Sequence, residues 1–303
     1  MKRVLLTGAS GFIGRQAIAP LLEQGYEVHG VSTVAQTRPH VQWHQADLFD
    51  MQQSDALMQK IRPTHLLHFA WYAVPGKYWT APENRRWVEA STALLQAFQH
   101  VGGQRVVMAG TCAEYDWNFG QCDEQTTPLQ PATLYGQCKH ELQTALSAYA
   151  GQAGFSNAWG RIFSLYGPHE YPSRLVASVI LALLRGETAK CSEGSVIRDY
   201  LHVADVASAF VALLDSEVQG AVNIGAGHGV ALKDVVDRIG MKMGRPDLIR
   251  RGALPTPASE PSLLVANTVR LQGTGWVPHH TLDSGLDDTI AWWRSQHAAG
   301  LHA

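Results

Sequence analysis

The chain has 303 residues, enough for one large domain or for one domain with a smaller lobe. It carries 24 Lys and Arg against 26 Asp and Glu, a net charge of −2, which gives no reason to expect a nucleic acid or an anionic membrane as partner. No apolar run reaches the roughly 18 residues that a membrane span needs, and the first residues enter a predicted strand without a signal-peptide pattern. We therefore expect a cytoplasmic protein.

Cysteine and histidine spacing gives no sign of a disulfide framework or a metal site. The four cysteines form no CxxC pair, and the 14 histidines show no zinc-like Cys/His spacing. We expect free thiols in a reducing compartment and no bound metal.

The first half of the chain alternates between apolar strands and amphipathic helices. Strands are predicted at 3–8, 26–32, 64–70, 105–110 and from residue 156 onward. Between them, helices are predicted at 14–25, 55–61, 85–102 and 134–149. Strands separated by helices form βαβ units, so we expect an α/β fold with a parallel sheet covered by helices on both faces.

The second half of the chain is less regular. Helices are predicted at 172–186, 203–215, 232–244 and 285–296, strands at 195–203 and 220–225, and an ordered loop at 250–261. No repeat or linker-like run divides the chain. We expect a larger domain over residues 1–165 and a smaller mixed α/β lobe over residues 166–303, with a site between them and some strand exchange across the boundary.

A glycine-rich turn follows the first predicted strand. The segment "LLTGASGFIGRQA" places Gly8, Gly11 and Gly14 between this strand and the first helix. Glycine lets the backbone approach a pyrophosphate closely, and the helix N-terminus offers free N–H groups and a positive dipole end. The alternative is an ordinary glycine-rich connection. The position of the turn favours dinucleotide binding, which makes 1–165 the cofactor domain.

The end of the second predicted strand bears on the choice of cofactor. An acidic residue there would bind the adenosine 2′-hydroxyl of NAD, but "GVSTVAQTRPH" has Ser32, Thr33 and Arg38 instead. Hydroxyls and an arginine accept the 2′-phosphate of NADP, so we favour NADP over NAD, with the alternative that Arg38 points into solvent. Asp47 is a candidate acceptor for the adenine amino group or, equally, a turn aspartate.

The segment "LYGQCKHEL" places Tyr135 four residues before Lys139 in one predicted helix. This spacing brings two side chains to the same face one turn apart. In an arbitrary helix such a pair is an ordinary surface contact. The rest of the sequence has to decide between that and a catalytic role.

Several motifs together resemble a known family. They are "TGASGFIG" at 7–14, "HFA" at 68–70, "AGTCAEY" at 109–115, Tyr135-x-x-x-Lys139, "LYGP" at 165–168 and "RDYLHVADVA" at 198–207. Their order is similar to that of extended short-chain dehydrogenases/reductases, in particular the NAD-dependent epimerase/dehydratase group that acts on nucleotide-diphosphate sugars. The resemblance covers nearly the whole chain and implies a Rossmann-type doubly wound sheet.

The resemblance, with the motif positions above, also implies a set of site residues. Catalysis is expected from Thr111, Tyr135 and Lys139, and substrate binding from Thr111, Arg174 and Arg198, although Arg198 alone also fits a surface arginine at a strand edge. The expected cofactor-binding residues are Gly8, Ser10, Gly11, Phe12, Ile13, Gly14, Ser32, Arg38, Asp47, Leu48, Phe69, Ala70, Trp71, Lys139 and Tyr166.

The tyrosine–lysine pair suits a hydride-transfer enzyme. Hydride transfer at a sugar carbon requires a proton to move on its oxygen, and a tyrosine of ordinary pKa near 10 is a poor base at neutral pH. A nearby ammonium and a cationic nicotinamide favour the phenolate and lower this pKa. The resemblance further implies that Lys139 binds the nicotinamide ribose and that Thr111 hydrogen-bonds the reacting oxygen.

Departures from the family pattern narrow the chemistry. The 4,6-dehydratases carry Asp-Glu directly after the active-site threonine, but here Cys112 and Ala113 follow Thr111, and Glu114 comes one place too late. Elimination of water is therefore not expected. The main prediction is an NAD(P)-dependent oxidoreductase that reduces a nucleotide-linked 4-keto-6-deoxyhexose.

Three other functions are weighed against this one. The first two are a nucleotide-sugar 4-epimerase and a dehydrogenase of a non-nucleotide alcohol or aldehyde. A regulator that senses the cofactor is disfavoured, because the chain keeps both Tyr135 and Lys139.

Two further segments leave alternatives open. The aromatic stretch "WYAVPGKYW" at 71–79 would stack on a sugar or base, close over the cofactor as a lid, or only cover the core. The family often dimerises through the two long helices, here 85–102 and 134–149, so a homodimer is expected. The first helix carries an apolar stripe that is wide enough to face both core and partner, formed by Trp87, Val88, Ala90, Leu94, Leu95 and Phe98.

Overall fold

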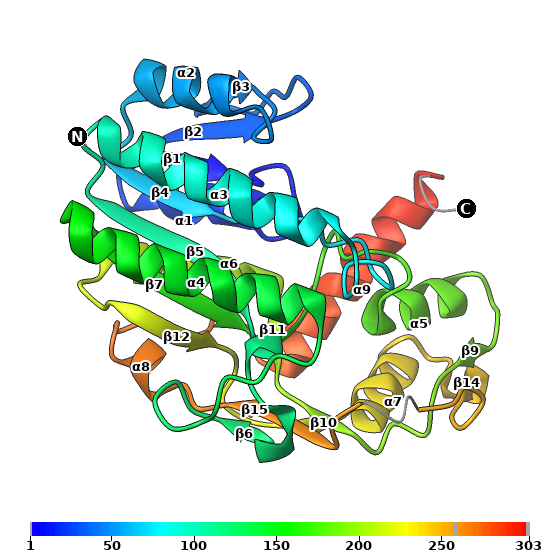
Figure 1. Cartoon of the computed structure of the whole chain (residues 1–303). Helices are drawn as coiled ribbons and strands as arrows, with labels where there is room; N and C mark the ends of the chain where they lie inside the picture. The colour runs from blue at the N-terminus through cyan, green and yellow to red at the C-terminus, as the bar shows by residue number, and fades with distance from the viewer. Residues whose placement is uncertain (1, 257–259, 301–303) are drawn as a thin grey trace.

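The main sheet has seven parallel strands in the order β12–β7–β5–β4–β1–β2–β3 (Figure 1). A computed structural model describes residues 2–256 and 260–300. The strands are β1 (Arg3–Thr7), β2 (Glu27–Ser32), β3 (Val41–Gln45), β4 (His65–His68), β5 (Arg105–Thr111), β7 (Ser156–Ile162) and β12 (Gly220–Ile224). The strand order reverses between β1 and β4, and ligands of such sheets bind at the carboxyl ends of the strands beside this switch point. The predicted doubly wound parallel sheet is confirmed.

Each face of the sheet is covered by helices. The helices α1 (Gly14–Glu23) and α6 (Val203–Asp215) pack on one face, and α2 (Met51–Ile61), α3 (Glu83–His100) and α4 (Leu134–Ala153) pack on the other. Side chains of β1 alternate between the two cores, with Val4 and Leu6 facing α1 and α6 and Leu5 facing the opposite side. Both faces are buried, which explains why these strands read as continuous apolar runs.

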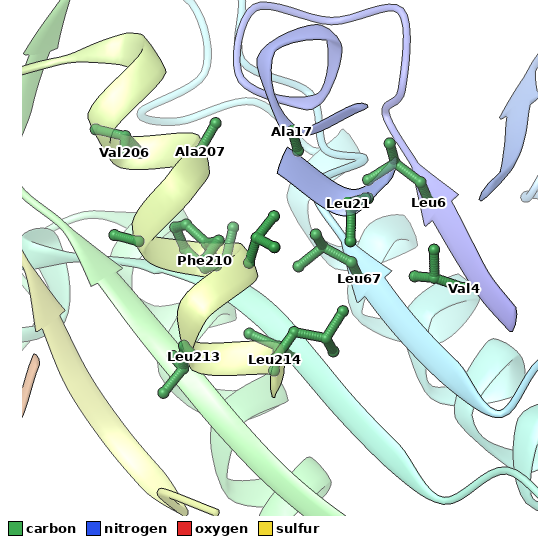
Figure 2. Packing of buried hydrophobic residues seen from close by; sticks show 14 of the residues in the cluster. Val4, Leu6, Ala17, Leu21, Leu67, Val206, Ala207, Phe210, Leu213 and Leu214 are labelled. Carbon is green, nitrogen blue, oxygen red and sulfur yellow. The ribbon is translucent and has the colours of Figure 1, made fainter. Parts of the chain in front are cut away.

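Helix α6 belongs to the main sheet although it comes from the second half of the chain. Phe210 projects from α6 toward Leu21 of α1 and Leu67 of β4, and all three are buried (Figure 2). Strand β12, which follows α6, pairs with β7 in parallel register from Gly220↔Ala158 to Ile224↔Ile162. The N-terminal sheet is therefore completed by residues beyond 200.

The C-terminal lobe packs helices against short strands. Its helices are α5 (Leu175–Leu184), α7 (Leu232–Lys242) and α9 (Leu282–Ala298). The short helix α8 (Val269–Gln272) lies against β12, and its Leu271 belongs to the core of the main sheet. A four-stranded sheet has the order β13 (Val230–Ala231), β10 (Ile197–Arg198), β15 (Leu263–Ala266), β6 (Gln121–Cys122). Two-stranded pairs join β8 (Ser164–Tyr166) to β11 (Tyr200–His202) and β9 (Ala189–Lys190) to β14 (Ile249–Arg250). Because β6 comes from the first half and pairs with β15, the chain crosses between the lobes in both directions.

Some predicted elements differ from the observed ones. The single strand predicted over 195–203 is two short strands, β10 and β11, and helix α6 already begins at Val203. The strand β3 was not predicted, because its sequence "VQWHQ" alternates weakly and is half-exposed along much of its length. The predicted loop over 250–261 includes residues 257–259, which lie outside the described residues. The predicted boundary at residue 165 falls inside β8 and remains a prediction.

The structure bears on two further expectations, about a membrane and about a dimer. In the described part of the chain, every helix is too short or too polar to cross a membrane. The apolar stripe of α3 is largely used inside the chain itself, since Val88, Ala90, Leu94, Leu95 and Phe98 are all buried and Trp87 is partly buried. The stripe therefore leaves little apolar surface for a partner, and the homodimer remains a prediction.

Candidate active site

Thr111 lies at the carboxyl end of β5, where a buried carboxylate fixes the strand end. The Glu114 carboxylate accepts hydrogen bonds from the Thr111 backbone N–H at 2.8 Å, from Trp159 Nε1 at 2.9 Å and from Arg161 Nε at 2.8 Å. In return, the Thr111 hydroxyl accepts the Ala113 N–H at 3.2 Å, which completes a capping box. Glu114 is fully buried, so its ion pair with Arg161 is held without competition from water.

Tyr135 lies in the first turn of α4 and faces Thr111. Helix α4 begins after Thr133, whose hydroxyl accepts the Gly136 N–H at 3.1 Å. The Thr111 side chain lies close enough to the Tyr135 hydroxyl to affect its pKa. Burial raises the pKa of Tyr135, and the nearby Tyr78 adds to this effect, whereas the Thr111 side chain opposes it. The chain by itself therefore favours the neutral phenol.

Lys139 follows one turn later and is almost completely buried. Its Nζ donates to the Ala109 carbonyl of β5 at 2.8 Å and lies 3.7 Å from the centre of the Trp71 ring. Burial lowers the pKa of Lys139 to about 7, against the opposing charge of Glu114. The expected lowering of the Tyr135 pKa by Lys139 is thus absent in the chain alone, because both groups are desolvated.

The aromatic segment after β4 covers Tyr135 and Lys139. The Tyr135 ring makes edge contacts with the rings of Trp71, Tyr78 and Trp79 at centroid distances of 6.5, 4.9 and 5.9 Å. The fully buried Asn84 holds this segment, since its Oδ1 accepts from Trp71 Nε1 at 2.8 Å and its Nδ2 donates to the Tyr78 carbonyl at 2.7 Å. The segment therefore forms part of the site wall and is not only a cover for the core.

The glycine turn fits a dinucleotide. Gly8 has φ +63°, and a Cβ there would lie 2.9 Å from the Ala70 backbone nitrogen. A Cβ on Gly14 would lie 2.2 Å from the Gly8 carbonyl oxygen, so this position accepts only glycine. Helix α1 begins at Gly14 without a side-chain cap on its N-terminus, and that leaves backbone N–H groups free for an anion. The turn residues Ser10, Gly11, Phe12 and Ile13 surround this helix end.

Two arginines stand beside the end of β2. Arg38 Nη1 donates to the Arg15 carbonyl at 2.9 Å, and Arg15 in turn contacts the Ser10 carbonyl and His169 Nδ1. Ser32 ends β2, and its hydroxyl accepts the Val34 N–H at 3.2 Å. Burial and the charge of Arg38 lower the pKa of Arg15, consistent with two cations close together.

The remaining predicted cofactor residues lie at other strand ends or in the core. Asp47 forms a turn, with its Oδ1 accepting the Phe49 N–H at 2.9 Å, and the buried Leu48 packs beneath it. Phe69 and Ala70 follow β4, opposite the glycine turn. Tyr166 is buried in the C-terminal lobe, where its hydroxyl donates to the Leu282 carbonyl at 3.2 Å.

The predicted substrate residues approach from the C-terminal lobe. Arg198 is buried and forms an ion pair with Glu260, with 2.9 Å between Nη2 and Oε1. Arg174 hydrogen-bonds the Tyr78 side chain, which touches Tyr135, and its Nε lies 3.9 Å from Glu170 Oε1. Arg174 is thereby joined to the catalytic tyrosine through one aromatic ring, whereas Arg198 lies near Cys112.

Sequence reasoning missed the side chains that hold this site together. Glu114 was considered only as a displaced acid, although the Thr-x-x-Glu spacing of a capping box was visible in the sequence. Trp159 carried no such local signal, because its partner Glu114 lies 45 residues away, and the contacts of Asn84 depend on the conformation of the loop before α3. All four cysteines are free thiols, and burial raises the pKa of Cys112 to about 12, which makes it a poor nucleophile.

Comparisons with known proteins agree with this geometry. The model of the NAD dependent epimerase/dehydratase family matches residues 4–225, which run from β1 to the end of β12. UDP-glucose 4-epimerase from Corynebacterium glutamicum is 27% identical over 308 residues, which cover 92% of this chain and 92% of that protein.

Solved structures show the same likeness. The UDP-glucose 4-epimerase of Thermus thermophilus in complex with NAD has a TM-score of 0.82 at 25% identity, covering 96% of this chain and 99% of that one. MoeE5 in complex with UDP-glucuronic acid and NAD has a TM-score of 0.83 at 28% identity, covering 98% of this chain and all of that one (100%). The resemblance inferred from the motifs is confirmed: the chain belongs to the NAD-dependent epimerase/dehydratase family and is an extended short-chain dehydrogenase/reductase.

Proposed function

We propose that this enzyme oxidises the C4 hydroxyl of a nucleotide-diphosphate sugar and then reduces the ketone from the opposite face, as a 4-epimerase does. The observation that carries the proposal is the meeting of Thr111, at the carboxyl end of β5, with Tyr135 and Lys139, which lie one turn apart on α4. Lys139 Nζ also binds the Ala109 carbonyl of β5 at 2.8 Å. The curated relatives support it, since several are UDP-glucose 4-epimerases of similar length.

The buried state of Glu114 argues against elimination. Its carboxylate already binds Arg161, Trp159 and the Thr111 N–H, and it has no exposed surface to meet a substrate. A dehydratase needs an acid and a base that reach the sugar. The active site therefore supports oxidation and reduction, and not loss of water.

The chain's own residues handle the proton. In the oxidation, Tyr135 takes the proton of the O4 hydroxyl while the hydrogen on C4 leaves as hydride with the electrons of the C–H bond. In the reduction, a hydride returns to C4, and Tyr135 gives the proton back to O4. Thr111 hydrogen-bonds the same oxygen, and the Lys139 ammonium stabilises the phenolate. When bound, the nicotinamide supplies the acceptor and donor of hydride, and its oxidised ring adds the positive charge that makes deprotonation of Tyr135 easier.

A second candidate function is the reduction of a nucleotide-linked 4-keto sugar with NADPH. The absence of an acidic residue at the end of β2 favours it, together with the adjacent Arg15 and Arg38. Two guanidinium groups there would pair with a 2′-phosphate. A reductase has to release its cofactor in each cycle, whereas an epimerase retains it.

Substrate binding is proposed to involve Arg198 and Arg174. A diphosphate would replace Glu260 as the partner of Arg198, since a guanidinium binds two phosphate oxygens at once. A cavity of about 500 Å³ lies beside Glu260 and is lined in part by Trp117 and Phe119, which offer apolar surface to a nucleobase. A dehydrogenase of simple alcohols would not need Arg198, so turnover of non-nucleotide alcohols would favour that alternative.

The test is a turnover assay with a matched variant. Purified enzyme is incubated with UDP-glucose or UDP-galactose, with and without added NAD, and the C4 epimer is followed by proton NMR. Replacing Tyr135 with Phe should lower kcat about 10²–10⁴-fold. Tyr149→Phe on the same helix, where the hydroxyl touches only Gln99, should leave turnover unchanged. Equal turnover by wild type and Tyr135→Phe would contradict the proposed chemistry.

The same preparation separates the two candidates. An epimerase converts the sugar without net consumption of cofactor, and a reductase oxidises NADPH in step with loss of a 4-keto sugar. Arg38→Ala should weaken NADPH binding by about 10–100-fold and NADH binding much less. Light scattering of the protein as it elutes from a size-exclusion column measures its molar mass and so tests the proposed homodimer.

A further inference from the structure

Three ligand-type side chains meet outside the catalytic cleft, at the junction of the two lobes. His202 ends β11, Asp205 lies in the first turn of α6, and His280 precedes α9. One ligand atom from each lies within 4.8 Å of the other two. The two imidazole rings face each other at a centroid distance of 4.1 Å. His202 and Asp205 are three residues apart, but His280 lies 75 residues beyond Asp205, so sequence spacing alone does not identify the cluster.

His202 is the part of this cluster that lacks an explanation within the chain. It is 3% exposed, and neither of its ring nitrogens has a hydrogen-bond partner among the described residues. Nε2 lies 3.4 Å from Asp288 Oδ2 without hydrogen-bond geometry. An unpartnered buried donor or acceptor costs about 1–3 kcal/mol, so such a group calls for a water molecule or an ion beside it.

The spacing of the polar atoms suits a tetrahedral metal ion. Zinc binds imidazole nitrogen and carboxylate oxygen at about 2.0–2.2 Å, and two ligand atoms of a tetrahedron then lie about 3.3 Å apart. The His280 Nδ1 to Asp205 Oδ2 distance is 3.2 Å. The His280–Asp205 distance therefore has the length of one edge of such a tetrahedron, and the ligand atoms of His202, Asp205 and His280 all lie within 4.8 Å of one another.

Asp205 keeps the capacity to bind an ion. Its Oδ1 accepts the His279 backbone N–H at 2.7 Å, and its Oδ2 accepts the His280 backbone N–H at 3.0 Å. A carboxylate offers about four lone-pair sites, so these bonds orient the group without using it up. The bonds would serve as outer contacts that aim Oδ2 toward the two imidazoles.

We propose that His202, Asp205 and His280 form a binding site for a divalent transition-metal ion of the zinc class, with the fourth position taken by a water molecule. The donor set of two imidazoles and a carboxylate suits zinc. The ion would tie α6 of the main sheet to the start of α9, and its role would be structural, because the catalytic residues lie elsewhere.

The experiment measures metal on the intact protein. Protein purified without chelators is analysed by elemental mass spectrometry, and chelator-treated protein is titrated with Co²⁺ and its visible absorption recorded. We expect about one zinc per chain, or tight rebinding of one equivalent, and an intense tetrahedral Co²⁺ band. Thermal unfolding should shift upward on adding zinc.

Variants decide whether these residues hold the ion. His280→Gln changes a partly exposed side chain and should fold, while metal affinity falls about 10–100-fold or more. His279→Gln is the matched control, because only its backbone touches Asp205. Failure of wild type to bind zinc or Co²⁺ at micromolar concentration would overturn the proposal and leave a buried water as the partner of His202. Equal binding by His280→Gln and His279→Gln would overturn it as well.

Discussion

The residues around Thr111 illustrate how one buried charge positions a catalytic strand end. The Glu114 carboxylate is surrounded by three donors, and its ion pair with Arg161 lies in a region closed to water. Such a pair adds little net stability when intact, because both ions lost their hydration, but breaking it leaves a buried charge without compensation.

Replacing Glu114 with Gln should therefore destabilise the protein by about 3–5 kcal/mol in urea unfolding, since Arg161 keeps its charge and loses its partner. Turnover at a temperature where the variant is folded should fall too, because Thr111 loses its anchor. Glu89→Gln, on the exposed face of α3, is the control and should change stability by less than about 0.5 kcal/mol. A small loss with Glu114→Gln would show that Arg161 finds another partner.

His68 should make the folded protein sensitive to acid. It is buried at the end of β4, where its Nδ1 and Nε2 pair with Thr7 at 2.8 Å and Ser91 at 3.0 Å. Burial and then the charge of Lys139 lower the pKa of His68 to about 3. Between pH 6.5 and 3 the unfolded chain binds a proton that the folded chain does not, so stability falls as pH drops through this window.

The measurement compares the free energy of unfolding at pH 7 and pH 5. The His68 contribution to the loss should be about 2 kcal/mol, and His68→Gln should remove that part of it. Val107→Ala, in the core of the neighbouring strand, should lower stability equally at both pH values. An unchanged pH dependence in His68→Gln would assign the acid sensitivity to other groups.

Individual residues were predictable from sequence where short-range spacing fixes geometry. Tyr135 and Lys139 lie one helical turn apart, and Thr111 ends a buried strand, so both were visible without coordinates. The hydrogen bonds of Asn84 with Trp71 and Tyr78 could not be predicted, because they depend on the conformation of a loop. The same holds for the meeting of His202 with His280, which depends on how α9 packs against α6.

At the scale of elements, the turn between β1 and α1 is fixed by sterics more than by attraction. Gly14 lies so close to the Gly8 carbonyl that no side-chain atom fits between them. The close packing brings the free N–H groups of α1 to the carboxyl end of β1. The triplet of glycines could be recognised from sequence because this contact allows no substitute.

Gly14→Ala should reduce dinucleotide affinity by at least about 100-fold, because the new methyl group would push α1 away from the turn. Gly151→Ala is the matched control: it lies in α4, where a Cβ would meet open space. That change should leave cofactor binding unchanged and stabilise the helix by about 0.5–1 kcal/mol. Isothermal titration with NADH and NADPH, together with thermal unfolding, measures both. Normal binding by Gly14→Ala would mean that the turn can open without cost.

Elements whose role depends on distant pairing were harder to predict. The parallel sheet covered by helices on both faces followed from the βαβ units, and the seven-stranded sheet confirms it, whereas the strand order was not predicted. Strands of two residues, such as β6 and β10, have no period of their own and exist only because a partner strand is present. The sequence shows that these two segments are polar or mixed in character, but it does not show that they pair with another strand.

At the scale of the whole molecule, the two lobes are built from interleaved parts of the chain. Asp199 lies at one crossing point, where its buried carboxylate accepts the N–H groups of Ala226, Gly227 and Ala266. These donors follow β12 of the main sheet and end β15 of the smaller one. One side chain thus holds together segments of both lobes.

A fragment that ends at residue 165 should fail to fold on its own. It would lack α6 and β12, which leaves the buried faces of α1 and β7 without cover. We expect it to be insoluble or to bind a hydrophobic dye, with no cooperative unfolding transition, while the full chain unfolds cooperatively. A fragment with a sharp transition would support an independent domain over 1–165.

The interleaving also sets when the protein can fold during synthesis. The sheet that carries the glycine turn is complete only after β12, so the nascent chain must expose Ile224 before this half can close. Until then the nascent chain exposes the unpaired edge of β7 and the uncovered apolar side of α1. Slowing the ribosome before residue 224 has left the exit tunnel should therefore increase aggregation, whereas slowing it after that point should not.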